Sequence, residues 1–259
     1  MSFPQVILLV ASRRGVRIAT ALLLASNAVA AGGALAQPTT QSAPAAERSS
    51  AVVMDSISVS SFRWLPPRDS YTAWVGGSVA TLTASDNENV NGYMRILGVQ
   101  WARDLFAWHG ARFSWVTEAL PLMLVNSRAP TRRIPPALRD ASRAPDPAAL
   151  ARYQPHDSWG FGIAPLSAQA EITHGERLSS VWQVTSGAAW FSKVVPFGRA
   201  TQYNFTVNPS VAMQWRATSG TRLSFGYTLH HLSNASFGGS NPGMNSHMFF
   251  TRITTERGR

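Results

Sequence analysis

The feature that most constrains the fold is a long stretch of alternating side chains in the C-terminal part of the chain. From residue 204 to residue 215, apolar and polar residues alternate at nearly every position. Successive residues of a β-strand point to opposite faces, so this stretch predicts a strand with one apolar and one polar face. Strands of soluble proteins have about 5–6 residues, whereas a strand tilted across a membrane needs about 9–11. The length therefore favours a strand that spans a membrane.

Further segments rich in β-forming residues complete a sheet. We expect eight strands, at residues 73–83, 92–103, 112–125, 158–172, 178–194, 203–217, 222–232 and 245–256. After the N-terminal region, no stretch approaches 18 uninterrupted apolar residues, which excludes a transmembrane helix there. The short segment 218–220 suits a periplasmic turn and the long segment 126–157 suits an external loop. The predicted fold class is all-β, an eight-stranded antiparallel outer-membrane β-barrel.

The N-terminal region has the pattern of an export signal. Three arginines precede an apolar run at residues 18–31, and Ala34-Leu35-Ala36 fits a small-residue cleavage site. We therefore expect a secretory signal peptide at residues 1–36 and localisation in the outer membrane of a Gram-negative bacterium. Residues 37–70 are expected to form a flexible lead-in, in which 52–62 make either a short strand or a plug-like segment. Residues 71–259 are the expected barrel domain.

Composition excludes several other classes of protein. The chain has no cysteine, which excludes a disulfide scaffold and a cysteine-ligated zinc site. The net charge of +10 would suit a nucleic-acid-binding protein, but no nucleic-acid motif is present and the chain is expected to be exported. We therefore expect no nucleic acid partner. The histidines lack the spacing of metal ligands, so we expect no metal site.

Candidate chemistry lies in the last third of the chain. His231 and Ser233 are two residues apart on a predicted strand, so they share a face with Leu223 and Phe225. That apolar face is expected to point to lipid, where polar groups are costly and often functional. A histidine able to take a serine proton is the minimum for a serine esterase. A His-x-Ser tripeptide is also common at polar rims, so the spacing alone leaves both interpretations open.

The string from His231 to Ala235, followed by Asn241-Pro242-Gly243 and a final strand, resembles the outer-membrane lipid A 3-O-deacylase (PagL) family. The resemblance implies an eight-stranded barrel whose active site faces the membrane near the outer leaflet. It also implies hydrolysis of the ester-linked acyl chain at the 3 position of lipid A, without a cofactor. Carried over, Ser233 is the nucleophile, His231 the general base, and Asn234 a ligand of the oxyanion. Asn241-Pro242-Gly243 has turn chemistry that would let the loop after Asn234 fold back beside Ser233.

The chain departs from the family pattern at the third catalytic position. Family members have a glutamate on the last strand, and that position falls on Asn245 here. An asparagine can accept the Nδ1 proton of a histidine and so orient it, but it brings no negative charge. The sequence therefore predicts a weaker esterase, a modified triad, or a barrel without activity. Two non-enzymatic functions stay open: a silent outer-membrane barrel that binds lipopolysaccharide, and a soluble periplasmic barrel that binds lipid.

Arginine is far more frequent than lysine, since Lys193 is the single lysine of the chain. The expected external loop contains six arginines: Arg128, Arg132, Arg133, Arg139, Arg143 and Arg152. Guanidinium groups bind phosphate with two parallel hydrogen bonds. We therefore expect Arg132 and Arg133 to bind the phosphates of lipopolysaccharide, the expected partner in the outer membrane, although codon composition alone could also explain the excess. A homodimer is left open as a further assembly.

Overall fold

The computed structural model describes residues 61–84, 90, 92–130, 133–140 and 146–257. The predicted signal peptide at residues 1–36 and most of the predicted lead-in lie outside the described residues, so both stay predictions. Of the segment 52–62, the described end enters a strand, β1 (Phe62–Trp64). β1 pairs with the end of β3, where Phe62 and Trp64 pack against Phe106.

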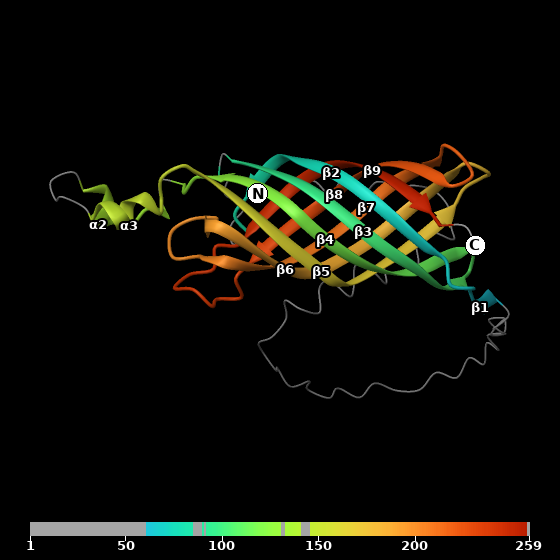
Figure 1. The fold of residues 1–259 in the computed structure, drawn as a ribbon. Helices are drawn as coiled ribbons and strands as arrows, with labels where there is room; N and C mark the ends of the chain where they lie inside the picture. The colour runs from blue at the N-terminus through green and yellow to red at the C-terminus, as the bar shows by residue number, and fades with distance from the viewer. Residues whose placement is uncertain (1–60, 85–89, 91, 131–132, 141–145, 258–259) are drawn as a thin grey trace, which may run out of the picture. The chain divides into compact units, whose positions relative to one another are not determined.

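Eight long antiparallel strands form a closed barrel (Figure 1). They are β2 (Asp69–Leu82), β3 (Tyr93–Trp108), β4 (Ala111–Ser127), β5 (His156–Thr173), β6 (Leu178–Val195), β7 (Thr201–Arg216), β8 (Thr221–Ser233) and β9 (Met244–Glu256). Each strand pairs with the next in sequence, and pairing of β2 with β9 closes the sheet. The predicted eight-stranded barrel is confirmed, and each predicted strand overlaps an observed one.

The largest difference from the predicted boundaries is at β3, which continues five residues past the predicted end at residue 103. It ends in a tight turn at His109 and Gly110, both with positive φ, 48° and 80°. Two consecutive residues with positive φ are the signature of the turn that matches the twist of a two-stranded hairpin. The sequence at this turn has a histidine where asparagine or aspartate is usual, so the local pattern does not mark the end of the strand.

The two ends of the barrel differ in the length of their connections. At one end the strands are joined by residues 109–110, 174–177 and 217–220; we call this the short-turn end. At the other, the long-loop end, they are joined by residues 83–92, 128–155, 196–200 and 234–243. The 128–155 connection contains the short helices α2 (Pro136–Arg139) and α3 (Pro147–Ala151). Among the described residues, no helix has the length and apolar character needed to cross a membrane.

The outward face of the barrel is apolar over most of its strands. Large apolar side chains with at least a third of their surface exposed include Val75, Leu97, Leu122, Phe161, Phe205, Phe225 and Phe249. The inward positions near the short-turn end are instead polar or charged, such as Glu171, Arg222 and Arg252. This arrangement is that of a barrel surrounded by lipid and is the reverse of a soluble barrel. It does not fit the soluble periplasmic alternative.

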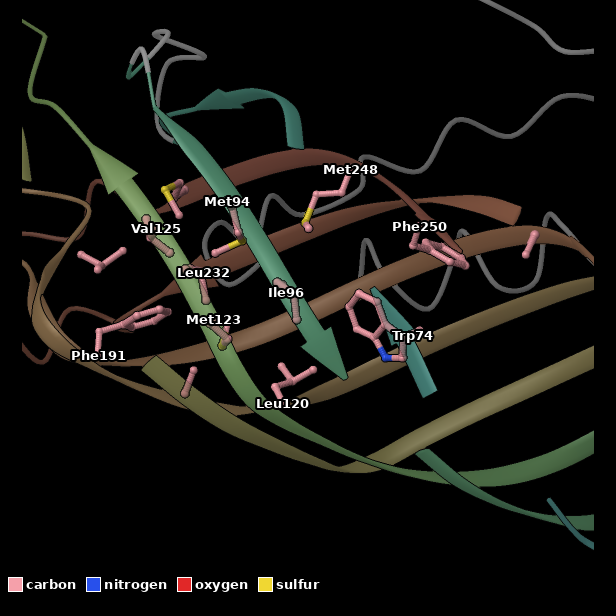
Figure 2. Packing of buried hydrophobic residues seen from close by; sticks show 14 of the residues in the cluster. Trp74, Met94, Ile96, Leu120, Met123, Val125, Phe191, Leu232, Met248 and Phe250 are labelled. Carbon is pink, nitrogen blue, oxygen red and sulfur yellow. The ribbon is translucent and has the colours of Figure 1, made fainter. Parts of the chain in front are cut away.

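The interior near the long-loop end is filled by apolar side chains (Figure 2). Phe191, Met94, Met123 and Met248 are fully buried there, together with Leu232 of β8. Because side chains alternate along a strand, burial of Leu232 turns its two neighbours on β8 toward the outside of the barrel. The apolar interior therefore decides which face His231 and Ser233 occupy.

A network of buried ions occupies the interior near the short-turn end. Arg222 Nη1 donates to both carboxylate oxygens of Glu171, at 2.7 and 2.8 Å. Arg222 also pairs with Glu256, which in turn pairs with Arg68. Each charge is thus compensated by a partner of opposite sign, as burial inside the barrel requires.

We expect Arg222→Met to destabilise the barrel by about 3–5 kcal/mol, because it leaves the buried carboxylate of Glu171 without its positive partner. The free energy of unfolding in urea, measured with the barrel inserted in lipid vesicles, checks this. Arg103→Met is the matched control, since Arg103 pairs with Asp69 at the exposed surface. Exposed ion pairs contribute little, so the control should unfold close to wild type, and equal losses in both variants would contradict the role given to the buried pair.

Candidate functional site

β8 presents two chemically different faces. Its inward residues Arg222, Ser224, Thr228, His230 and Leu232 are all buried. Its outward residues begin with Leu223 and Phe225, of which Phe225 is 60% exposed. His231 and Ser233 follow on the same outward face and are half-buried. The two side chains therefore lie on the lipid side of the barrel, at the long-loop end.

His231 and Asn245 form a hydrogen-bonded pair across the β8–β9 ladder. They are directly opposite in register, and His231 Nδ1 lies 2.7 Å from Asn245 Oδ1. An amide oxygen can only accept a hydrogen bond, so the proton of this bond belongs to Nδ1. The other ring nitrogen, Nε2, then carries a lone pair. This is the tautomer that a general base needs.

Ser233 is the last residue of β8, and its hydroxyl oxygen accepts two hydrogen bonds. One comes from Asn241 Nδ2 at 2.9 Å and the other from the backbone N–H of Ala235 at 3.2 Å. Both neighbours are donors, so the hydroxyl hydrogen itself is not used in either bond. No hydrogen bond joins Ser233 to His231 among the described residues. The two are separated by about 6.6 Å along the strand, on the same face, and catalytic hydrogen bonds often form only when substrate is bound.

The side chain of Asn234 organises the β8–β9 loop. It is buried, its Nδ2 donates to Ser240 O at 2.9 Å, and its Oδ1 accepts from Ser236 N at 3.0 Å. Its backbone N–H donates to Asn241 Oδ1 at 3.2 Å. The side-chain amide of Asn234 is thus used within the loop, and the amide beside the Ser233 hydroxyl belongs to Asn241.

Asn241 is the site residue that sequence reasoning did not single out. It was considered only as part of a turn, because Asn-Pro-Gly is ordinary turn chemistry. The predicted return of this loop to Ser233 is confirmed by the Asn241 contact. Gly243 has a φ of 58°, and a Cβ there would lie 2.7 Å from Ala84 Cβ and 3.8 Å from His231 Cε1. A side chain at this position would therefore be strained by the positive φ and would collide with Ala84, while the distance to the histidine ring is an ordinary contact.

A second polar pair lies on the same outward face, further from the loops. Tyr227 OH lies 2.6 Å from Nδ1 of His247, a residue opposite Leu229 in register. The pair compensates two polar groups that would otherwise face lipid alone. Because Nδ1 of His247 is bonded to Tyr227, this atom is not a partner of His231 or Asn245.

Of the two arginines predicted to bind phosphate, one is among the described residues. Arg132 lies outside the described residues. Arg133 lies in the β4–β5 connection and is half-buried, and its backbone N–H donates to Pro130 O at 2.8 Å. Their predicted role stays a prediction. In the part of the chain that the structure describes, no group of three or more His, Asp or Glu side chains is arranged to hold a metal ion.

Comparison with known families gives one match. The model of the lipid A 3-O-deacylase (PagL) family matches residues 147–254. The matched segment runs from α3 into β9 and includes His231, Ser233 and Asn245. The resemblance inferred from the sequence is confirmed. No curated protein matches the sequence.

Several solved barrels are similar in fold. The crystal structure of the outer membrane enzyme PagL is 17% identical, with 71% of this chain and 97% of that chain covered and a TM-score of 0.45. Ail, the attachment invasion locus protein of Yersinia pestis, in complex with a heparin analogue, is 8% identical, with 74% and 98% covered and a TM-score of 0.39. Neisserial surface protein A is 9% identical, with 72% and 96% covered and a TM-score of 0.39. At these identities the likeness concerns the fold alone.

The His231–Asn245 pair predicts a specific protonation pattern. In wild type, neutral His231 should carry its proton on Nδ1, because Asn245 Oδ1 accepts from it. Removal of the acceptor in Asn245→Ala should shift His231 toward the Nε2–H tautomer. The 15N chemical shifts of histidine-labelled protein in detergent micelles measure this. Tyr227→Phe is the control, since it should alter only His247; an unchanged His231 in Asn245→Ala would rule out the assigned pairing.

Proposed function

Because residues 147–254 match the lipid A 3-O-deacylase (PagL) family, we propose that this protein is a serine esterase of the outer membrane. Its reaction is hydrolysis of the 3-O-linked acyl chain of lipid A in lipopolysaccharide. The observation that carries the proposal is the outward-facing His231–Asn245 pair on the same face of β8 as Ser233. Outer-membrane barrels place long loops outside the cell, which puts this site at the outer leaflet, where lipopolysaccharide lies.

The proposed reaction begins with proton transfer from the Ser233 hydroxyl to His231 Nε2. The serine oxygen attacks the ester carbonyl and forms a tetrahedral intermediate. Its collapse breaks the bond to the sugar oxygen, which takes the proton from His231 and leaves as an alcohol. Water, activated by the same histidine, then hydrolyses the acyl-enzyme and releases the fatty acid. Neither step requires a cofactor.

Stabilisation of the oxyanion falls to the β8–β9 loop. Asn241 Nδ2 already donates to Ser233 Oγ at 2.9 Å, so a small shift brings it to the carbonyl oxygen of a bound ester. Asn234, the residue expected from the resemblance, contributes by holding Asn241 through its backbone N–H. Donors that are fixed before the reaction are the most effective at stabilising developing charge.

The outer face also offers a place for the acyl chain. An open apolar groove of about 510 Å³ runs over β2, β3, β4, β8 and β9, with Leu97, Leu122, Phe225 and Phe249 in its wall. Phe249 is opposite Tyr227, which precedes Ser233 by six residues on β8, about 20 Å along the strand. An acyl chain attached at Ser233 would run along the apolar outer face in the direction of this groove.

A second function is favoured by one observation, the amide at position 245. Without a negative charge beside His231, the imidazolium formed during proton transfer is less stabilised. A barrel that binds lipopolysaccharide without cleaving it is the alternative. The two functions differ in whether lipid A changes when the protein is present.

We expect production of the protein in a Gram-negative host to release one 3-linked hydroxyacyl chain from lipid A. Ser233→Ala should abolish the release, with a loss of about 1,000-fold or more, because the nucleophile is gone. Mass spectrometry of lipid A from the two strains measures it. Ser224→Ala, an inward-facing serine of the same strand, is the matched control and should retain activity. Identical lipid A from wild type and Ser233→Ala would support the silent barrel.

Asn245→Glu should raise the rate about tenfold. A carboxylate makes a charge-assisted hydrogen bond to the imidazolium, stronger than a neutral one by roughly 1–1.5 kcal/mol, and 1.36 kcal/mol corresponds to tenfold. Initial rates on purified lipid A in detergent micelles check the change. Asn245→Glu combined with Ser233→Ala must be inactive, and a fall in rate for Asn245→Glu alone would exclude an orienting role for position 245.

A further inference from the structure

The β6–β7 connection packs against the loop that follows Ser233. Arg199 O accepts a hydrogen bond from Ser240 N at 3.3 Å. The side chain of Arg199 lies over Gly239, where a Cβ would come within 2.6 Å of the guanidinium Nε and 2.9 Å of Cζ. A Cβ at Gly238 would lie 2.6 Å from Arg199 O. Two consecutive glycines therefore allow an arginine to lie directly on the loop that carries Asn241.

The guanidinium group of Arg199 is exposed and uncompensated. It forms no ion pair or side-chain hydrogen bond in the part of the chain that the structure describes. The carboxylates of Asp69, Asp104, Glu171 and Glu256 pair with other arginines, at the short-turn end. A cation held against a loop without a carboxylate is available to an anion from outside the protein.

The loop under Arg199 also meets the apolar outer face of the barrel. Phe237, in the same loop, is 80% exposed and packs against Phe205, with ring centroids 5.9 Å apart. Phe205 is the cross-strand neighbour of Ser233 on β7. The same loop thus carries an exposed apolar ring at Phe237 and, over Gly239, the side chain of Arg199. Gly239, under Arg199, is two residues from Asn241, which contacts the Ser233 hydroxyl.

We propose that Arg199 binds a phosphate group of the lipid A headgroup while the ester of the same molecule lies at Ser233. This inference rests on the proposed function and adds a substrate-selecting residue to it. A guanidinium fork matches the geometry of a phosphate and binds it with two hydrogen bonds. On the glucosamine of lipid A that bears the 3-linked ester on C3, the phosphate is on C1, two bonds away. A phosphate held by Arg199 would fix which ester reaches the serine.

The test compares two substrates, phosphorylated lipid A and the same lipid A after enzymatic dephosphorylation, in detergent micelles. Arg199→Ala should lower kcat/KM on the phosphorylated substrate about tenfold and leave the rate on the dephosphorylated one unchanged. Arg199→Lys should lose less, because lysine keeps the charge without the fork. Arg177→Ala, in a short turn at the opposite end of the barrel, is the matched control and should behave as wild type on both.

Equal effects of Arg199→Ala on the two substrates, or none on either, would overturn the inference while leaving the esterase intact. Inactive wild-type protein would instead overturn the proposed function. In that case binding of the two lipids to the Ser233→Ala variant, with and without Arg199→Ala, still decides the role of Arg199. Loss of preference for the phosphorylated lipid on removal of Arg199 supports the inference, and an unchanged preference refutes it.

Discussion

The placement of the site depends on the burial of one side chain, Leu232. It is fully buried in the apolar cluster that fills the barrel near the long-loop end (Figure 2). Alternation along the strand then forces His231 and Ser233 onto the outer face. A shift of β8 by one residue would reverse every side chain and bury both in the interior. The chemistry at the membrane surface is therefore fixed by packing on the opposite face of the sheet.

A carboxylate beside a catalytic histidine both orients the ring and stabilises its positive charge, whereas the amide of Asn245 can only orient His231. Asn245 Oδ1 selects the tautomer and orientation of the ring through a 2.7 Å hydrogen bond. It adds no charge, so stabilisation of the imidazolium is left to the surrounding dipoles. On the outer face of a barrel this has a physical benefit, because a carboxylate facing lipid is costly to desolvate. The neutral pair thus costs less to hold in an apolar environment, and it stabilises the imidazolium of the proposed reaction less than a carboxylate would.

Much of the barrel could be predicted from the sequence because alternation is a strong local signal. The stretch from residue 204 to 215 is read from side-chain type alone, and β7 matches it closely. The orientation of His231 also follows from the alternation, whereas position 245 is reached through the resemblance to the family; in the structure it lies opposite His231. The role of Asn241 did not follow, because it depends on how a ten-residue loop returns, and turn residues such as Pro242 and Gly243 do not specify that path. The contact of Arg199 with Gly239 joins two loops that are far apart in sequence, and no local pattern reports it.

The end of β8 divides the site into a rigid and an adjustable half. His231 is held by neighbours on both sides, Val207 of β7 and Asn245 of β9. Ser233 is paired only with Phe205, because the β8–β9 ladder ends at Leu232 and Met244. The backbone of His231 is thus held by strand pairing on both sides, whereas that of Ser233 is held on one side, at the end of the β8–β9 ladder. In the proposed reaction, Ser233 and its loop can therefore shift without displacing His231, which is paired on both sides.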